Sequence, residues 1–192
     1  NKSVFFLESN GFLPKSCVRR YLTASDEIAK IYSELSATVP LHRIHGDCHK
    51  GNLLNGRDGW FFLDFDDFLN GPAVQDMWML FPLNSDCFQY QRNIFLDAYR
   101  EFCDFDESWL NLIELLRAFR FIHYSAWIAK RWTDPAFPPL FPHFGTPEYW
   151  EKETNDLEIQ LKLIEKGSVP SKKTQPAEVE PELTNKDYFW DL

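Results

Sequence analysis

The stretch from residue 44 to residue 67 constrains the fold more than any other part of the chain. Two apolar runs flank a polar loop, and a Gly-Arg-Asp-Gly tetrapeptide interrupts the second run. Short apolar runs bounded by glycine and aspartate are typical of strands joined by turns. The expected elements are a strand end at 41–44, a loop at 46–51, a strand at 53–55, a turn at 56–59 and a returning strand at 60–65. This pattern predicts an antiparallel hairpin.

Four polar side chains lie where this hairpin would bring them together. His45, Asp47 and Asn52 occupy the loop with the spacing H-x-D-x-x-x-x-N, and Asp64 follows 12 residues after Asn52. Magnesium prefers hard oxygen ligands, which Asn52 and Asp64 supply. A carboxylate near the metal, but not one of its main ligands, suits the base that orients and deprotonates an acceptor hydroxyl, and Asp47 fits that role. The pattern therefore predicts a phosphoryl-transfer site.

Neighbouring residues leave other interpretations open. Asp66 and Asp67 either contact a second metal ion or the loop backbone, or are simply solvated. Lys50 either neutralises phosphate charge or is solvated like most loop lysines. Side chains of the types that bind zinc also occur here, at His42, His45, His49 and Cys48. No helix aligns these groups and no second ligand cluster lies elsewhere in the sequence, so magnesium is the preferred interpretation.

Residues 45–54 and 62–67 resemble the catalytic core of the aminoglycoside phosphotransferase and choline kinase group of protein-kinase-like enzymes. The resemblance extends over roughly residues 5–166. It narrows to one bacterial branch, whose members are cytoplasmic serine/threonine protein kinases, in the segments 70–80, 116–120, 126–127 and 131–138.

This resemblance implies a role for each residue of the motif. Asp47 would be the catalytic base, and Asn52 and Asp64 would bind Mg²⁺ and, through it, the co-substrate ATP. Asp76 would accept hydrogen bonds from the loop backbone at the start of the next helix, and His45 would pack beneath the loop. The implied fold is α+β: a protein-kinase-like C-terminal lobe, mainly helical, with a small antiparallel catalytic hairpin.

The chain departs from the family upstream of the motif. No glycine-rich phosphate loop and no lysine-bearing strand precede His45, and the 44 residues before it are too few for the family's N-terminal lobe. We therefore expect residues 1–166 to form the C-terminal lobe alone, followed by a flexible acidic tail with an aromatic end at 167–192. The start at Asn1 rather than methionine fits either a fragment or a processed chain. We also expect exposed apolar surface where the missing lobe would pack, and negligible phosphotransfer by the chain alone.

Three functions remain open on these grounds. The first is a serine/threonine protein kinase, and the second is a small-molecule kinase of the choline, homoserine or aminoglycoside type. The third is a non-catalytic docking module, because the N-terminal lobe is missing. The expected partners are ATP and a hydroxyl acceptor, for a monomer or for a lobe that pairs with the missing half.

Composition indicates which partners and which cellular compartment suit the protein. A net charge of -9 disfavours a surface for nucleic acid. The four cysteines form no C-x-x-C pair, which favours reduced thiols in the cytoplasm, and no apolar run is long enough for a membrane span.

Periodic apolar residues predict helices at 16–35, 71–82, 86–102, 108–132 and 148–166. Asn70 is the expected cap of the second helix, and Pro72 is expected in its first turn.

Overall fold

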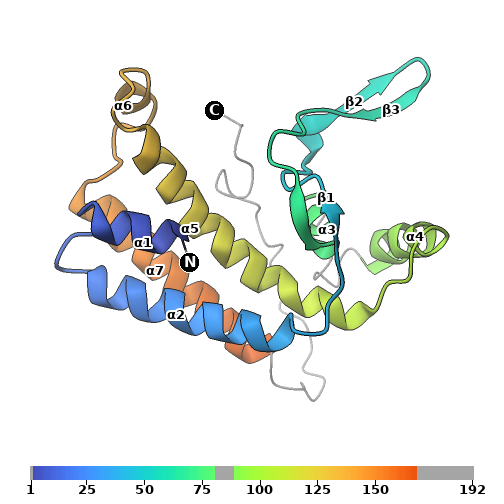
Figure 1. Cartoon of the computed structure of the whole chain (residues 1–192), viewed down its shortest axis with the longest axis horizontal. Helices are drawn as coiled ribbons and strands as arrows, with labels where there is room; N and C mark the ends of the chain where they lie inside the picture. Colours follow the sequence, from blue (N-terminus) through green and yellow to red (C-terminus); the bar gives the residue numbers. More distant parts are fainter. Residues whose placement is uncertain (1, 81–88, 168–192) are drawn as a thin grey trace. The chain divides into compact units, whose positions relative to one another are not determined.

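The structure is a computed structural model that describes residues 2–80 and 89–167 of the 192-residue chain. Helices dominate this part, and its strands form two small antiparallel sheets, which confirms the predicted α+β class (Figure 1). Contacts divide the chain into two compact units. The described part of the first unit comprises residues 2–34 and 114–167, and that of the second comprises residues 35–80 and 89–113.

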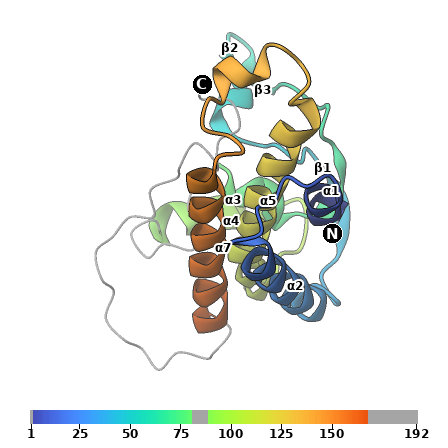
Figure 2. The ribbon, with the colours of Figure 1, turned by 90° about the vertical axis from the view of Figure 1, so that its left-hand side faces the viewer.

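Helices form the described part of the first unit. They are α1 (Lys2–Ser9), α2 (Val18–Leu35), α5 (Ile113–Arg131, in this unit from Glu114 onward), α6 (Phe137–Leu140) and α7 (Pro147–Gly167). Helices α2, α5 and α7 run side by side (Figures 1 and 2). Their core side chains are almost completely buried, notably Ile28, Ile122, Trp150 and Leu157. Each such side chain stabilises the fold by about 1.5–3 kcal/mol relative to an exposed one.

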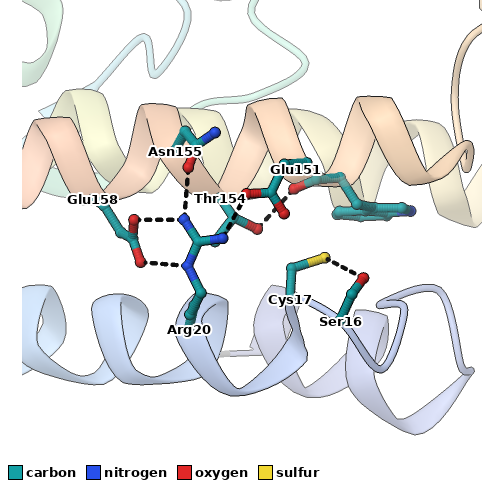
Figure 3. A network of polar contacts seen from close by, with 8 residues as sticks. Ser16, Cys17, Arg20, Glu151, Thr154, Asn155 and Glu158 are labelled. Atoms are coloured by element: carbon teal, nitrogen blue, oxygen red, sulfur yellow. Dashed lines mark hydrogen bonds and ion pairs between the residues drawn. The ribbon is translucent and has the colours of Figure 1, made fainter.

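A polar network also joins α2 to α7 (Figure 3). The guanidinium of Arg20 donates to both carboxylate oxygens of Glu158, at 2.9 and 2.7 Å, and also to Glu151 and Asn155. The hydrogen bond to Glu158, followed by that to Glu151, raises the pKa of Arg20. The same bond lowers the pKa of Glu158. The planar fork of arginine suits this arrangement because it presents several donors in fixed directions.

The second unit contains the strands. β1 (Leu41–Ile44) pairs antiparallel with β4 (Leu69–Pro72), with Ile44 opposite Leu69. β2 (Leu53–Gly56) pairs antiparallel with β3 (Gly59–Phe62), with Leu53 opposite Phe62, and this hairpin projects from the unit (Figure 1). The predicted hairpin is therefore confirmed, although β3 ends at Phe62 rather than at residue 65.

Short helices complete the described part of the second unit. They are η1 (Lys50–Asn52), α3 (Val74–Trp78), α4 (Gln89–Arg100) and η3 (Glu107–Leu112). Val74 and Trp78 of α3, Leu96 of α4 and Leu112 of η3 are almost fully buried. Large apolar side chains are exposed on the hairpin and the segment after it, namely Leu54, Trp60, Phe61, Phe62, Leu63, Phe65, Phe68 and Leu69. That this surface is the one against which a missing lobe would pack stays a prediction.

The structure corrects some of the predicted helix starts. The helix expected from residue 71 begins at Val74, so the predicted cap at Asn70 and first turn at Pro72 are wrong. Residues 69–72 instead pair with β1, and Pro72 ends that strand, where its missing N–H is tolerated. The helix expected from residue 108 begins as a 3-10 helix and becomes α-helical at Ile113. Helix α1 was not among the predicted helices.

Other element predictions are confirmed. α2 and α7 occupy the predicted ranges to within two residues at each end. α4 confirms the helix expected at 86–102 for the part that is described, whereas residues 81–88 and most of the predicted tail at 167–192 lie outside the described residues. No helix in residues 2–80 or 89–167 is long and apolar enough to span a membrane.

Candidate active site

The loop that carries Asp47 begins with a glycine that no other residue can replace without strain. Gly46 has φ +87, in the left-handed region that favours glycine. A Cβ on Gly46 would lie 2.3 Å from the carbonyl oxygen of Asp67. The loop therefore lies directly against the segment that follows Asp64.

Asp76, in the first turn of α3, holds the start of this loop. Its carboxylate accepts hydrogen bonds from the backbone N–H groups of His45, at 2.7 Å, and Gly46, at 2.9 Å. Burial raises the pKa of Asp76, and the two backbone hydrogen bonds counteract that shift in part. The contact is the one that the family resemblance implies for Asp76.

The side chain of His45 connects the loop to the residue before Asp64. Its Nε2 donates to the carbonyl oxygen of Leu63 at 2.7 Å, and its Nδ1 faces the backbone N–H of Asp47 at 3.4 Å. The ring also packs against Phe65, with centroids 4.6 Å apart. Because both ring nitrogens face protein groups, His45 is placed to maintain the loop rather than to exchange protons with a substrate.

Asn52 lies at the other end of the loop, at the start of the hairpin. Its Nδ2 donates to the carbonyl oxygen of Asp47 at 3.0 Å, which places Oδ1 on the opposite side of the amide. Its own carbonyl oxygen accepts the N–H of Leu63 at 2.9 Å. The hairpin thereby holds Asn52 beside the residue that precedes Asp64, as the sequence pattern predicted.

Asp64 has an unusual backbone conformation. It is the one residue other than glycine with a positive φ, +59, among those the structure describes. Such conformations cost about 1–3 kcal/mol and concentrate at functional sites. The side chain is exposed, as are those of Asp66 and Asp67. Exposed carboxylates can supply oxygen ligands of the kind that Mg²⁺ takes, and Mg²⁺ completes its shell with phosphates and water.

Asp47 itself is buried, with 4% of its surface exposed. Its Oδ2 lies 3.4 Å from Nε2 of His49, a residue that we considered from the sequence only as a zinc ligand. The signal that was missed is the position of His49, two residues after the acid and inside the same glycine-flanked loop.

Neighbouring groups make Cys48, His45 and His49, three of the four side chains suggested for zinc, less able to bind it. Burial, followed by the charges of Asp76 and Asp47, raises the pKa of the Cys48 thiol to about 12, so this side chain is a thiol rather than a thiolate. His45 and His49 both use ring nitrogens within the loop. Across residues 2–80 and 89–167, no three His, Cys, Asp or Glu side chains are grouped so as to hold a metal ion.

Hydrogen bonds thus join the loop that carries Asp47 to Asn52 and to Leu63, the residue before Asp64. The chain belongs to the phosphotransferase enzyme family, whose sequence profile matches residues 15–113. That range contains every candidate site residue.

Curated relatives give a closer comparison. Stress response kinase A of Escherichia coli strain K12 is 42% identical over 161 residues, which cover 82% of this chain and 48% of that protein. Stress response kinase A of Salmonella typhi is 40% identical over 158 residues, with the same coverage. Serine/threonine protein kinase RdoA of Salmonella typhimurium strain LT2 is 40% identical over 160 residues, again with 82% and 48% covered.

These relatives confirm the narrower resemblance of the chain, which is similar to bacterial stress response kinase A. The chain spans about half the length of the curated relatives it matches.

Proposed function

We propose that this chain is the catalytic C-terminal lobe of an ATP- and magnesium-dependent serine/threonine protein kinase. The observation that carries the proposal is the linkage of Asp47 to Asp64: Asp76 and His45 hold the loop, and His45 also bonds the residue before Asp64. A phosphoryl-transfer site depends mainly on such positioning, since the protein contributes little covalent chemistry.

Each side chain has a defined task in this proposal. The carboxylate of Asp47 orients the acceptor hydroxyl and accepts its proton while the hydroxyl oxygen forms a bond to the γ-phosphorus and the bond to the ADP oxygen breaks. Oδ1 of Asn52 and the carboxylate of Asp64 would hold Mg²⁺. The bound ion would neutralise the charge of the ATP phosphates. Asp76 and His45 keep the loop in place.

The names of the relatives support the proposed class of acceptor. Their names include "serine/threonine protein kinase" and "stress response kinase A", which supports a hydroxyl of serine or threonine in a protein as the acceptor. We also propose that the protein acts in the cytoplasm. Among the described cysteines, Cys17, Cys48 and Cys103 are free thiols, which fits a reducing compartment.

The test is phosphate transfer by the full-length natural protein. Mg²⁺ and ATP labelled at the γ-phosphate are supplied with a panel of proteins and, in parallel, with choline, homoserine and an aminoglycoside. Asp47→Asn should lower kcat by about 10²–10⁴-fold, the usual contribution of a general base, while ATP binding is unchanged. Asp58→Asn, in the exposed turn of the hairpin, makes the same change in charge and should retain the wild-type rate.

Each outcome decides between the candidate functions. Full activity of the Asp47→Asn variant would exclude Asp47 as the base. Transfer to small molecules alone would replace the protein kinase with a small-molecule kinase. A lack of transfer to every acceptor would leave a docking module.

A further inference from the structure

His49 lies beside Asp47 and has a well-defined environment. It precedes η1 as its N-cap residue, with extended backbone at φ −112 and ψ 169. Like Asp47, it is 4% exposed. Its Nδ1 accepts a hydrogen bond from the backbone N–H of Gly51 at 3.0 Å.

This hydrogen bond determines which ring nitrogen carries the proton. A backbone N–H only donates, so Nδ1 of His49 must present its lone pair to Gly51. In the neutral imidazole the proton then resides on Nε2. Nε2 lies 3.4 Å from Oδ2 of Asp47, close enough for electrostatic attraction although the pair does not have hydrogen-bond geometry.

Gly51 is adapted to the ring. A Cβ at this position would lie 2.8 Å from Cε1 and 2.9 Å from Nδ1 of His49. Because these are atoms of a buried ring, a larger residue would push the imidazole away from its place beside Asp47. The close approach therefore depends on glycine at position 51.

We propose that His49 is a positioning residue for the carboxylate of Asp47, an inference that rests on the proposed function of that acid as the base. A carboxylate rotates about a broad terminal torsion, and a base that is misplaced by about 1 Å loses up to 10²-fold in rate. The Nε2–H group of His49 restricts that rotation by attracting Oδ2. Burial strengthens the attraction because water competes little at this site.

The alternative is a purely local role, in which His49 only caps η1. Two substitutions separate the roles. In His49→Asn, Oδ1 takes the place of Nδ1 and accepts the N–H of Gly51, but the shorter side chain does not reach Asp47. In His49→Gln, the longer amide carries an N–H group to the position of Nε2, while the cap is lost.

The experiment measures kcat and the KM for ATP of the full-length natural protein and both variants. Positioning predicts that His49→Asn lowers kcat by about 10- to 100-fold with KM for ATP within about twofold of wild type, and that His49→Gln retains most of the rate. The opposite order, with an active His49→Asn and a weak His49→Gln, would overturn the proposal.

A second measurement is independent of activity. Nitrogen NMR of the ring in mildly alkaline buffer should show the proton of His49 on Nε2, and the signal of this nitrogen should shift in Asp47→Asn. A proton on Nδ1, or an unchanged Nε2 signal, would overturn the proposal whatever the enzyme does. If the wild-type protein transfers no phosphate but the NMR result is as expected, the proposed function fails while the contact between His49 and Asp47 stands.

Discussion

The substitution Asp76→Asn tests how the catalytic loop is held. The carboxylate accepts two backbone hydrogen bonds with separate oxygens, Oδ2 for His45 and Oδ1 for Gly46. Asparagine has a single acceptor oxygen, so one of the two N–H groups must face an amide NH₂ group instead. Loss of one hydrogen bond to a charged acceptor costs about 1.5–3 kcal/mol.

Amide hydrogen exchange measures this cost where it arises. One of the amides of His45 and Gly46 should exchange about 10- to 150-fold faster in Asp76→Asn, the factor that corresponds to the lost free energy. Asp58→Asn serves as the matched control because it removes one negative charge from an exposed turn of the same unit. Equal exchange rates in Asp76→Asn and the wild-type protein would refute the argument that Asp76 holds the loop.

The raised pKa of Asp76 predicts how the unfolding free energy depends on pH. Because burial raises the pKa of Asp76 in the folded protein, the folded state retains this proton over a range where the unfolded chain has released it. The contribution of Asp76 to stability is therefore greatest below the ordinary pKa of aspartate and declines as the pH rises above about 4. The difference in unfolding free energy between wild type and Asp76→Asn should narrow as the pH rises, and a widening difference would contradict the direction of the shift.

Other substitutions probe the backbone and the interior. Gly46→Ala should destabilise the second unit and abolish phosphate transfer because its Cβ would meet the carbonyl of Asp67. Urea unfolding should show a smaller loss of stability for the control Gly59→Ala, because Gly59 also has a positive φ but its Cβ would meet no atom within 4 Å. Asp64→Asn should lose magnesium-dependent ATP binding in calorimetry without loss of stability, since asparagine tolerates φ +59, whereas Asp64→Ala should also lower the unfolding temperature. Arg20→Lys should lower the thermal midpoint nearly as much as Arg20→Gln, because lysine lacks the planar fork, and high salt should reduce both effects.

Local patterns in the sequence predicted the hairpin beside the candidate site because they specify its geometry. Apolar runs separated by a Gly-Arg-Asp-Gly turn specify the β2–β3 hairpin, and the spacing of Asn52 and Asp64 then places both beside the same end of it. The long helices α2 and α7 could also be predicted from the sequence, since their apolar residues recur every three or four positions.

Features that depend on distant partners were not predictable in this way. β4 is a strand because it pairs with β1, and the Gly-Pro pair within it favours a helix start when the partner is unknown. The left-handed backbone of Asp64 is a conformation that residue types alone do not reveal. The division into two units likewise follows from contacts rather than from any change in composition.

The first unit is discontinuous in sequence, and this has a consequence for the order of folding. The hydrogen bond from Arg20 to Glu158 joins residues 138 positions apart, whereas the bonds of His45 to Leu63 and Asp76 span 18 and 31 positions. Contacts between nearby residues form faster because closing a short loop costs less entropy. During synthesis, the contacts of the loop that carries Asp47 can therefore form before α7 has left the ribosome, whereas the contacts between α2 and α7 cannot.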